Sequence, residues 1–188
     1  MLVVVSPNLA FERDLPRSGR APQFYVRFLM ITGTITASDY LNAQRLHRRK
    51  AEFFYFAASG VAIVIGLVLL VTEFRFPGYI VIAGGVGGAI GELVTSLSIL
   101  PWKVRRLHSQ QKDLASPFTY RWSPEFLEAK GVSGETKRPW KNYAKVKENK
   151  NMFLLYHADN LFEMFPKTWF ENNEQEDEFR GLAKNAGT

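Results

Sequence analysis

The sequence predicts an α+β membrane protein, in which a two-helix transmembrane hairpin carries a small antiparallel β-sheet domain with a C-terminal helix. Three observations predict this fold class. Two long apolar runs lie in the middle of the 188-residue chain, near residues 51–72 and 77–100. Short, partly alternating segments follow, separated by turn-forming residues. The final segment, Glu174 to Lys184, has acidic residues at its start and a lysine at its end, as the helix dipole favours.

Composition narrows the chemistry that the chain can carry. The mean hydropathy of -0.13 averages a very apolar middle with two polar flanks. Cysteine is absent, which excludes a disulfide framework, thiolate metal sites and a cysteine nucleophile. The histidines His47, His108 and His157 lack metal-ligand spacing, and the sequence has no nucleophile elbow or catalytic carboxylate pair. We therefore expect no enzymatic activity, no cofactor and no metal.

We divide the chain into four parts. Residues 1–22 form a tail without periodicity, either disordered or upstream of the true start. Residues 23–50 supply an N-terminal strand or strand pair, then a helix for which Ser38 is a suitable N-cap. Residues 51–100 form the hairpin, and residues 101–188 form a cytosolic domain.

The two apolar runs are long enough to cross a bilayer. No charged residue occurs from Phe53 to Val71. At about 1.5 Å per residue, a helix over 51–72 is roughly 33 Å long, against a hydrocarbon core of about 30 Å. The connector between the runs is too short to hold a domain, so the two spans are antiparallel neighbours.

Basic residues lie at one end of the predicted hairpin. The connector holds only Arg75, whereas the outer flanks hold Arg45, Arg48, Arg49, Lys50, Lys103, Arg105 and Arg106. The positive-inside rule then predicts a multi-pass protein of the cytoplasmic (inner) membrane with both termini in the cytosol. We expect the lipid bilayer and its anionic headgroups as partners, with Arg105 and Arg106 as candidate contacts. No recognised nucleic-acid motif accompanies the basic residues, so we expect no nucleic acid.

The second span contains the glycine-rich run GGVGGAIGE, residues 84–92. A phosphate-binding loop needs a strand before the glycines and a helix N-terminus that faces water, and an apolar span supplies neither. Small residues spaced by four let two helix backbones approach closely. This spacing relates Gly84 to Gly88 and Gly87 to Gly91, and it predicts close packing of the hairpin or of two hairpins in a homo-oligomer.

Glu92 is the one charged residue of the second span. An ionised carboxylate near the bilayer centre costs on the order of 3 kcal/mol, so it is normally neutral, paired or directed at a cavity. Counting inward from the cytosolic end of each span places Glu92 at the depth of Ser59. Two interpretations stay open: a protonated Glu92 that bonds Ser59 or a second copy, and a proton or ion relay.

The segment after the hairpin predicts hairpin-connected strands and one terminal helix. In order, we expect strands over 116–122 and 126–130, a turn over 131–137, a strand over 140–147 with a bulge at Tyr143, and strands in the runs MFLLYHAD and LFEMF. Pro166 ends the last strand because proline lacks an N–H. Asn172 or Asn173 then caps the final helix.

A family resemblance rests on residues of this last segment. In chain order they are Gly134, Trp140, Tyr143, Val146, Glu148, Phe153, Leu154, Leu155, Tyr156, Phe165, Pro166, Lys167 and Phe170. This order resembles the C-terminal domain of the YcxB-like family, small bacterial membrane proteins of unknown function. The resemblance extends over residues 23–184, and it implies a compact cytosolic β-sheet with a terminal helix but no activity. The strand count suggests a pleckstrin-homology-like domain split by the hairpin.

Two hypotheses for function follow. The first is a membrane-anchored cytosolic interaction or regulatory module that binds an unknown protein partner or anionic lipid headgroups; an immunity protein against a membrane-targeting toxin is one specialised form. Here Lys167 is either a solvated lysine or a fixed cation that faces lipid phosphate or a partner. The alternative is a small transporter, or a proton or ion relay, centred on Glu92.

Overall fold

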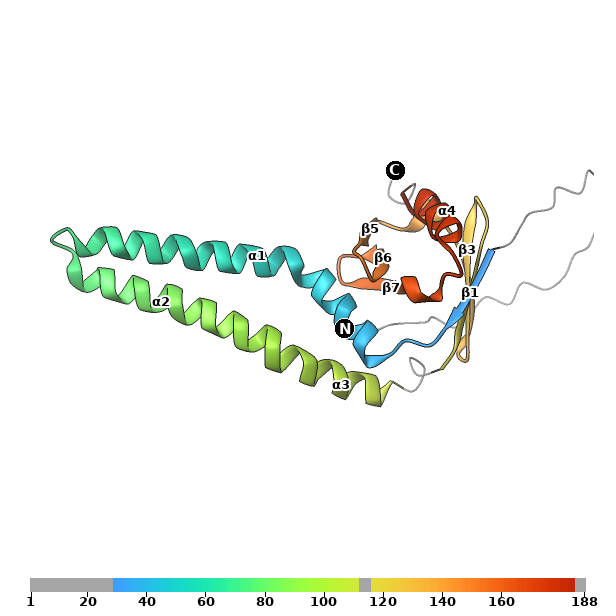
Figure 1. Cartoon of the computed structure of the whole chain (residues 1–188), viewed down its shortest axis with the longest axis horizontal. Helices are drawn as coiled ribbons and strands as arrows, with labels where there is room; N and C mark the ends of the chain where they lie inside the picture. The colour runs from blue at the N-terminus through green and yellow to red at the C-terminus, as the bar shows by residue number, and fades with distance from the viewer. Residues whose placement is uncertain (1–28, 112–115, 185–188) are drawn as a thin grey trace, which may run out of the picture. The chain divides into compact units, whose positions relative to one another are not determined.

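The structure is a computed structural model that describes residues 29–111 and 116–184. The predicted tail over 1–22, and the first part of the predicted strand over 23–28, lie outside the described residues. Within the described part, the chain forms two compact units, drawn in Figure 1, and each of them is considered by itself below.

The hairpin unit, Ala37–Gln110, consists of two long antiparallel helical arms. The first arm is α1 (Ala37–Leu70). The second begins with α2 (Arg75–Val94), passes through the π-helical turn η1 (Thr95–Ile99) and continues as α3 (Leu100–Gln110). In the tight turn between the arms, the Thr72 hydroxyl donates to Leu69 O (2.7 Å) and accepts from Phe74 N (3.2 Å).

Both arms are long and apolar enough to cross a membrane by length and composition. Their most apolar 18-residue windows have mean hydropathies of 2.4 and 1.7, and only 6% of each window is buried. The predicted helix after Ser38 and the first predicted span are one continuous helix. The second arm likewise runs ten residues past Leu100, where we expected the span to end.

The strand unit contains two antiparallel sheets and a terminal helix. The first sheet has the order β1 (Leu29–Gly33), β2 (Phe118–Trp122), β3 (Phe126–Gly131) and β4 (Gly134–Pro139). The second has the order β5 (Lys145–Glu148), β6 (Met152–Ala158) and β7 (Leu161–Pro166). The chain ends its described part in α4 (Asn173–Lys184). The α+β class with an antiparallel sheet domain and a C-terminal helix is therefore confirmed.

Strand β1 pairs with β2, although the whole hairpin unit separates them in sequence. Ile31 lies opposite Tyr120, and Gly33 opposite Phe118. Both Ile31 and Tyr120 are buried in the core of the strand unit. The hairpin unit is thus an insertion between two adjacent strands of one sheet.

Two predicted elements after the hairpin were wrong. The expected turn over 131–137 is shorter, because Gly131 pairs directly with Gly134 and strand β4 starts there; Gly134 has a φ of 139°, which favours glycine. The expected strand over 140–147 begins instead with a 3₁₀ turn, η3 (Trp140–Asn142). That turn, and not a bulge, puts Tyr143 out of step with the strand; the register shift lies in β6, between Tyr156 and Ala158.

Helix α4 closes the core of the strand unit through Phe179, which is fully buried. Its ring centroid lies 5.2 Å from that of Trp122, 5.6 Å from Trp140 and 4.9 Å from Phe165. These three residues come from both sheets and from η3, so one aromatic side chain joins the helix to every layer. Asn172 caps the helix, since its Oδ1 accepts from Gln175 N at 2.8 Å.

Candidate functional site

The seam between α1 and α2 is made of small residues spaced by seven. A β-carbon added to Gly66 would lie 2.9 Å from Gly78 O, and one added to Gly85 would lie 2.9 Å from Ser59 O. Gly78 and Gly85 are one heptad apart, as are Gly66 and Ser59. Such spacing keeps one narrow stripe of each helix against the other, as in left-handed helix pairs.

The predicted glycine pairs divide between this seam and the outside of the hairpin. Gly88 belongs to the seam, where an added β-carbon would lie 3.1 Å from Ser59 Oγ. Gly84, Gly87 and Gly91 have nothing within 4 Å of an added β-carbon. The predicted spacing of four is therefore not the one that packs the hairpin. Association of two hairpins through the outward glycines stays a prediction.

Glu92 lies against Arg48 and not against Ser59, so the predicted Ser59 partner was wrong, while a bond to a second copy stays a prediction. Arg48 Nη2 donates to Glu92 Oε1 at 3.0 Å, and Ser96 Oγ donates to Glu52 Oε1 at 3.5 Å. Gly85 faces Ser59 across the seam. Because the two helices are antiparallel, the residue one heptad after Gly85, Glu92, is level with the residue one heptad before Ser59, Glu52. Counting from Leu100 overstated its depth, because the helix does not end there.

Glu52 directly precedes the charge-free run that starts at Phe53. Its level thus marks the edge of the apolar band, and Glu92, Arg48 and Ser96 all lie near that edge. The π-helical turn η1 begins three residues after Glu92, at Thr95, whose hydroxyl donates to Gly91 O at 2.8 Å. The charged side chains between the two arms, Arg48, Glu52 and Glu92, are accordingly gathered at one end of the hairpin.

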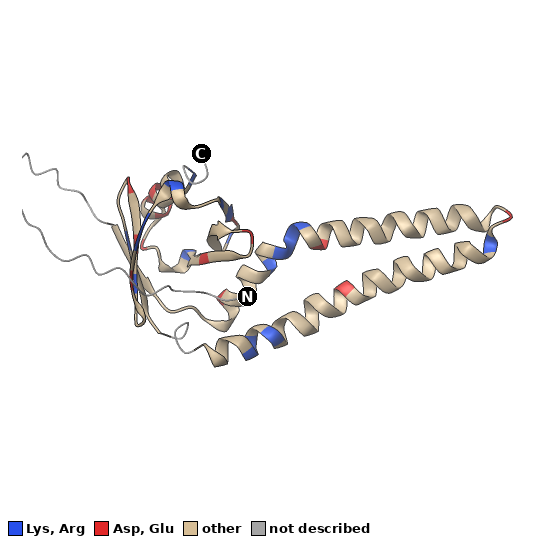
Figure 2. Ribbon diagram, turned by 180° about the vertical axis from the view of Figure 1, so that it is seen from behind, with Lys and Arg blue, Asp and Glu red and all other residues tan. Residues whose placement is uncertain are grey.

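Six further basic residues surround that end of the hairpin; we call them the basic collar. They are Arg45, Arg49 and Lys50 on α1, and Lys103, Arg105 and Arg106 on α3, and all six are exposed. Figure 2 shows basic segments on both arms, away from the turn. Among the described residues, none of the six has a carboxylate within ion-pair distance, whereas Arg48 has Glu92.

Lys167 is held inside the strand unit by two carboxylates. Its Nζ lies 2.6 Å from Glu148 Oε1 and 2.9 Å from Glu176 Oε1. Arg180 of α4 also binds Glu148, with Nε at 3.0 Å from Oε1, and contacts Glu176. The two cations therefore tie α4 to the edge of the sheet at β5. The charge of Lys167 is balanced within the strand unit; its predicted role in contacting phosphate or a partner stays a prediction.

This ion network shifts the pKa values of three groups; that of Arg180 is raised, chiefly by its hydrogen bonds to Glu148. Partial burial of Glu148 disfavours its charged form, but hydrogen bonds from Arg180 and Lys167 outweigh burial and hold the pKa of Glu148 below its ordinary value. Burial likewise works against the Lys167 ammonium, but Glu148 and Glu176 raise its pKa above the ordinary value. The network therefore stabilises the strand unit at neutral pH, where Glu148 is ionised and Lys167 is protonated.

Replacing Glu148 with Gln is expected to change the acid sensitivity of the strand unit. Since the folded pKa of Glu148 lies below the unfolded value of 4.5, its contribution is full above that value and is lost as pH falls through the folded pKa. Its side chain is 31% exposed, so the contribution is about 1 kcal/mol. Denaturant unfolding should show a wild-type advantage at pH 7 that disappears near the folded pKa. Glu135→Gln, on exposed Glu135, is the matched control, and a constant advantage at all pH values would contradict the prediction.

A second polar network, which the sequence pattern did not indicate, lies at the edge of the core. His157 Nε2 lies 2.8 Å from Glu163 Oε1 and 2.7 Å from Arg138 Nη1, and the Tyr143 hydroxyl donates to Glu163 Oε2 at 3.3 Å. Burial raises the pKa of Tyr143, and nearby Glu163 adds to the effect. These groups satisfy one another across strands β4, β6 and β7. The contact between His157 and Glu163 depends on how β6 pairs with β7, and the sequence pattern does not indicate that register.

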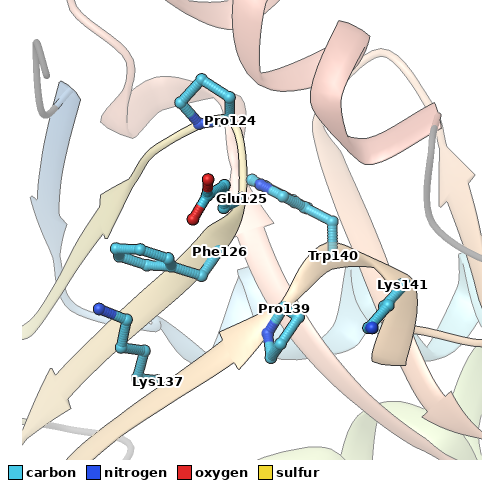
Figure 3. A pocket seen from close by; sticks show the side chains of 7 residues that line it. All are labelled: Pro124, Glu125, Phe126, Lys137, Pro139, Trp140 and Lys141. Carbon is cyan, nitrogen blue, oxygen red and sulfur yellow. The ribbon is translucent and has the colours of Figure 1, made fainter. Parts of the chain in front are cut away.

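The strand unit also has an open pocket with an aromatic and proline lining (Figure 3). Its residues are Pro124, Glu125, Phe126, Lys137, Pro139, Trp140 and Lys141. Trp140 is fixed by a hydrogen bond from its Nε1 to Ser123 O (2.8 Å), and the Lys137 ammonium lies 3.3 Å from the Phe126 ring centroid. Among the described residues, no group of three or more His, Asp or Glu could hold a metal ion.

The fold and these sites define an α+β chain in which a hairpin of two membrane-length apolar helices interrupts a two-sheet domain. Residues 122–183 match the family model described as YcxB-like protein, which confirms the resemblance predicted from the sequence. The match covers β3 to β7 and nearly all of α4, and is shorter than the predicted 23–184. No curated protein and no solved structure matches the chain.

Proposed function

We propose that the protein is a membrane-anchored interaction module, whose hairpin spans the cytoplasmic membrane and whose strand unit works in the cytosol. One observation carries the proposal. The hairpin packs through small residues along its seam, while its large apolar side chains point outward; Val64 is 60% exposed, Val68 58% and Ile80 59%. Small residues inside and large apolar side chains outside are the reverse of what a water-soluble protein has, and they suit a hydrocarbon environment.

The proposed orientation rests on charge. The collar and Arg48 lie at the end of the hairpin that joins the strand unit in sequence, and the turn carries only Glu73 and Arg75. Because basic residues favour the cytosolic side, the strand unit and both chain ends belong to the cytosol in this proposal. A pleckstrin-homology-like arrangement of its two sheets and terminal helix is part of the same proposal.

The module has two surfaces that suit a ligand, each within one unit. The basic collar suits anionic headgroups, and the pocket beside Phe126 and Trp140 suits a protein segment, since aromatic and proline side chains supply contact area at a low entropy cost. The immunity hypothesis is a narrower form of this proposal, and no observation favours it over other protein partners.

Reporter fusions test the proposed orientation. Alkaline phosphatase, which is active only outside the cytosol, is expected to be active when inserted after Thr72 and inactive when fused after Gln111. A reporter that is active only in the cytosol should give the reverse pattern at the same two positions and serves as the control. Phosphatase activity after Gln111 would contradict the proposed topology.

The alternative function, a relay centred on Glu92, gains no support from the geometry. A relay of this kind needs a carboxylate near the bilayer centre, whereas the register of the seam puts Glu92 level with Glu52 at the edge of the apolar run. A carboxylate at that edge, paired with Arg48, has a lower desolvation cost and an ordinary structural explanation. The relay stays an untested prediction.

A further inference from the structure

We propose that the basic collar binds the phosphate groups of anionic lipids, so that the hairpin gathers an anionic lipid shell at the cytosolic leaflet. This inference deepens the proposed function and rests on it, because the collar meets headgroups only if the hairpin spans the bilayer. It names the ligand class as anionic phospholipid and the site as six residues on two helices.

The collar residues have no carboxylate partners among the residues that the structure describes. In the described strand unit, Lys137, Arg138, Lys145, Lys167 and Arg180 all have carboxylate partners. In the described hairpin unit, Arg48 has Glu92. The six collar residues are exposed and have no carboxylate partner in the described structure, so they are available to an external anion. Arg121, Lys130 and Lys141 of the strand unit share this property but do not lie on the apolar arms.

The three cations of α3 are distributed around the helix. A helix turns by about 100° per residue, so Lys103 and Arg105 are about 200° apart and Arg106 lies on a third side. Val104, between them, is buried. The cations consequently point in several directions around the arm. A ring of headgroups surrounds a helix in this way, whereas a folded protein partner would contact one side.

An exposed aromatic residue lies beside the cations of α3. Trp102 is 58% exposed, and the Arg106 guanidinium carbon lies 5.5 Å from its ring centroid. Tryptophan favours the membrane interface, and it lies here directly next to the cations of α3. Each lysine or arginine near an anionic leaflet adds to the attraction between helix and headgroups, and salt screens that attraction over roughly 10 Å. Three cations on one arm are thus enough for a measurable lipid preference.

Bromine quenching of Trp102 tests the inference in the full chain. The protein is reconstituted in vesicles of equal parts phosphatidylcholine and phosphatidylglycerol, with bromine on the acyl chains of only one of the two lipids. The signal of Trp102 is the difference between the wild type and Trp102→Phe. We expect brominated phosphatidylglycerol to quench Trp102 severalfold more than brominated phosphatidylcholine at low salt, and the difference to shrink at high salt.

Two triple variants make the test specific. Lys103→Gln/Arg105→Gln/Arg106→Gln is expected to abolish the lipid preference. Arg121→Gln/Lys130→Gln/Lys141→Gln removes the same charge from exposed positions of the strand unit and should keep it. Equal quenching by the two lipids in the wild type would overturn the inference and leave an acidic protein as the ligand class, and so would equal effects of the two triple variants. Absence of quenching by either lipid would instead overturn the proposed membrane insertion.

Discussion

Replacing Phe179 with alanine is expected to lower the denaturant midpoint of the strand unit sharply, so that the variant is mostly unfolded at denaturant concentrations at which the wild type is still folded. The side chain is fully buried and contacts Trp122 and Trp140, so its loss leaves a cavity where helix and sheets meet. Deleting a buried phenylalanine side chain costs about 3–5 kcal/mol. A domain has a total stability of roughly 5–15 kcal/mol, so this one substitution removes a large part of it.

Denaturant unfolding of the full chain in mild detergent measures the effect, with the fluorescence of the four tryptophans as the signal; two of them, Trp122 and Trp140, are buried in the core. Phe179→Leu, which keeps most of the volume, should lose clearly less stability. Phe74→Ala deletes the same group from a 63% exposed position in the hairpin turn and should change stability by less than about 0.5 kcal/mol. Equal midpoints for Phe179→Ala and Phe74→Ala would contradict the proposed role of Phe179.

Replacing Gly85 with leucine is expected to separate the two arms of the hairpin. A β-carbon at this position would lie 2.9 Å from both Ile63 Cγ1 and Ser59 O, and the backbone oxygen cannot move aside as a flexible side-chain end can. Overpacking of a tight contact costs about 1–3 kcal/mol. Here the cost falls on the association of two helices that are held together mainly by close packing.

The absence of cysteine makes the measurement direct. A β-carbon at Gly88 would lie 3.1 Å from Ser59 Oγ, so cysteines at these two positions can form an intramolecular disulfide. Mild oxidation should cross-link the double-cysteine protein, and adding Gly85→Leu should lower the cross-linked fraction by about tenfold. Gly84→Leu, one residue away and facing open space, should leave it unchanged. Equal cross-linking of the two leucine variants would show that the seam is not as described.

The features that the sequence predicts well are those that depend on neighbouring residues. The charge-free run from Phe53 to Val71 specifies a long apolar helix whatever it packs against. Asn172, with glutamates after it, specifies the start of α4 through a local cap and the helix dipole. The strand pattern and the family resemblance depend on the same short-range order of residues.

Features that depend on register could not be predicted in this way. The pairing of β1 with β2 joins residues separated by the entire hairpin unit, and no local pattern encodes it. The depth of Glu92 depends on which glycines of α2 meet α1, and an error of one heptad moves a residue about 10 Å along the helix. The carboxylate partners of Lys167 come from β5 and α4, which meet it only after folding.

The sequence by itself determined the class of this protein: two membrane-length apolar helices, a strand-rich C-terminal segment of the YcxB-like type, and a basic excess beside the apolar runs. Only the tertiary structure decided which cations are neutralised. Arg48 and Lys167 find carboxylates, whereas the six collar residues do not, among the residues described. The physical reason is that composition and periodicity follow from neighbours in the chain, while charge pairing over a few ångströms depends on the relative register of packed elements.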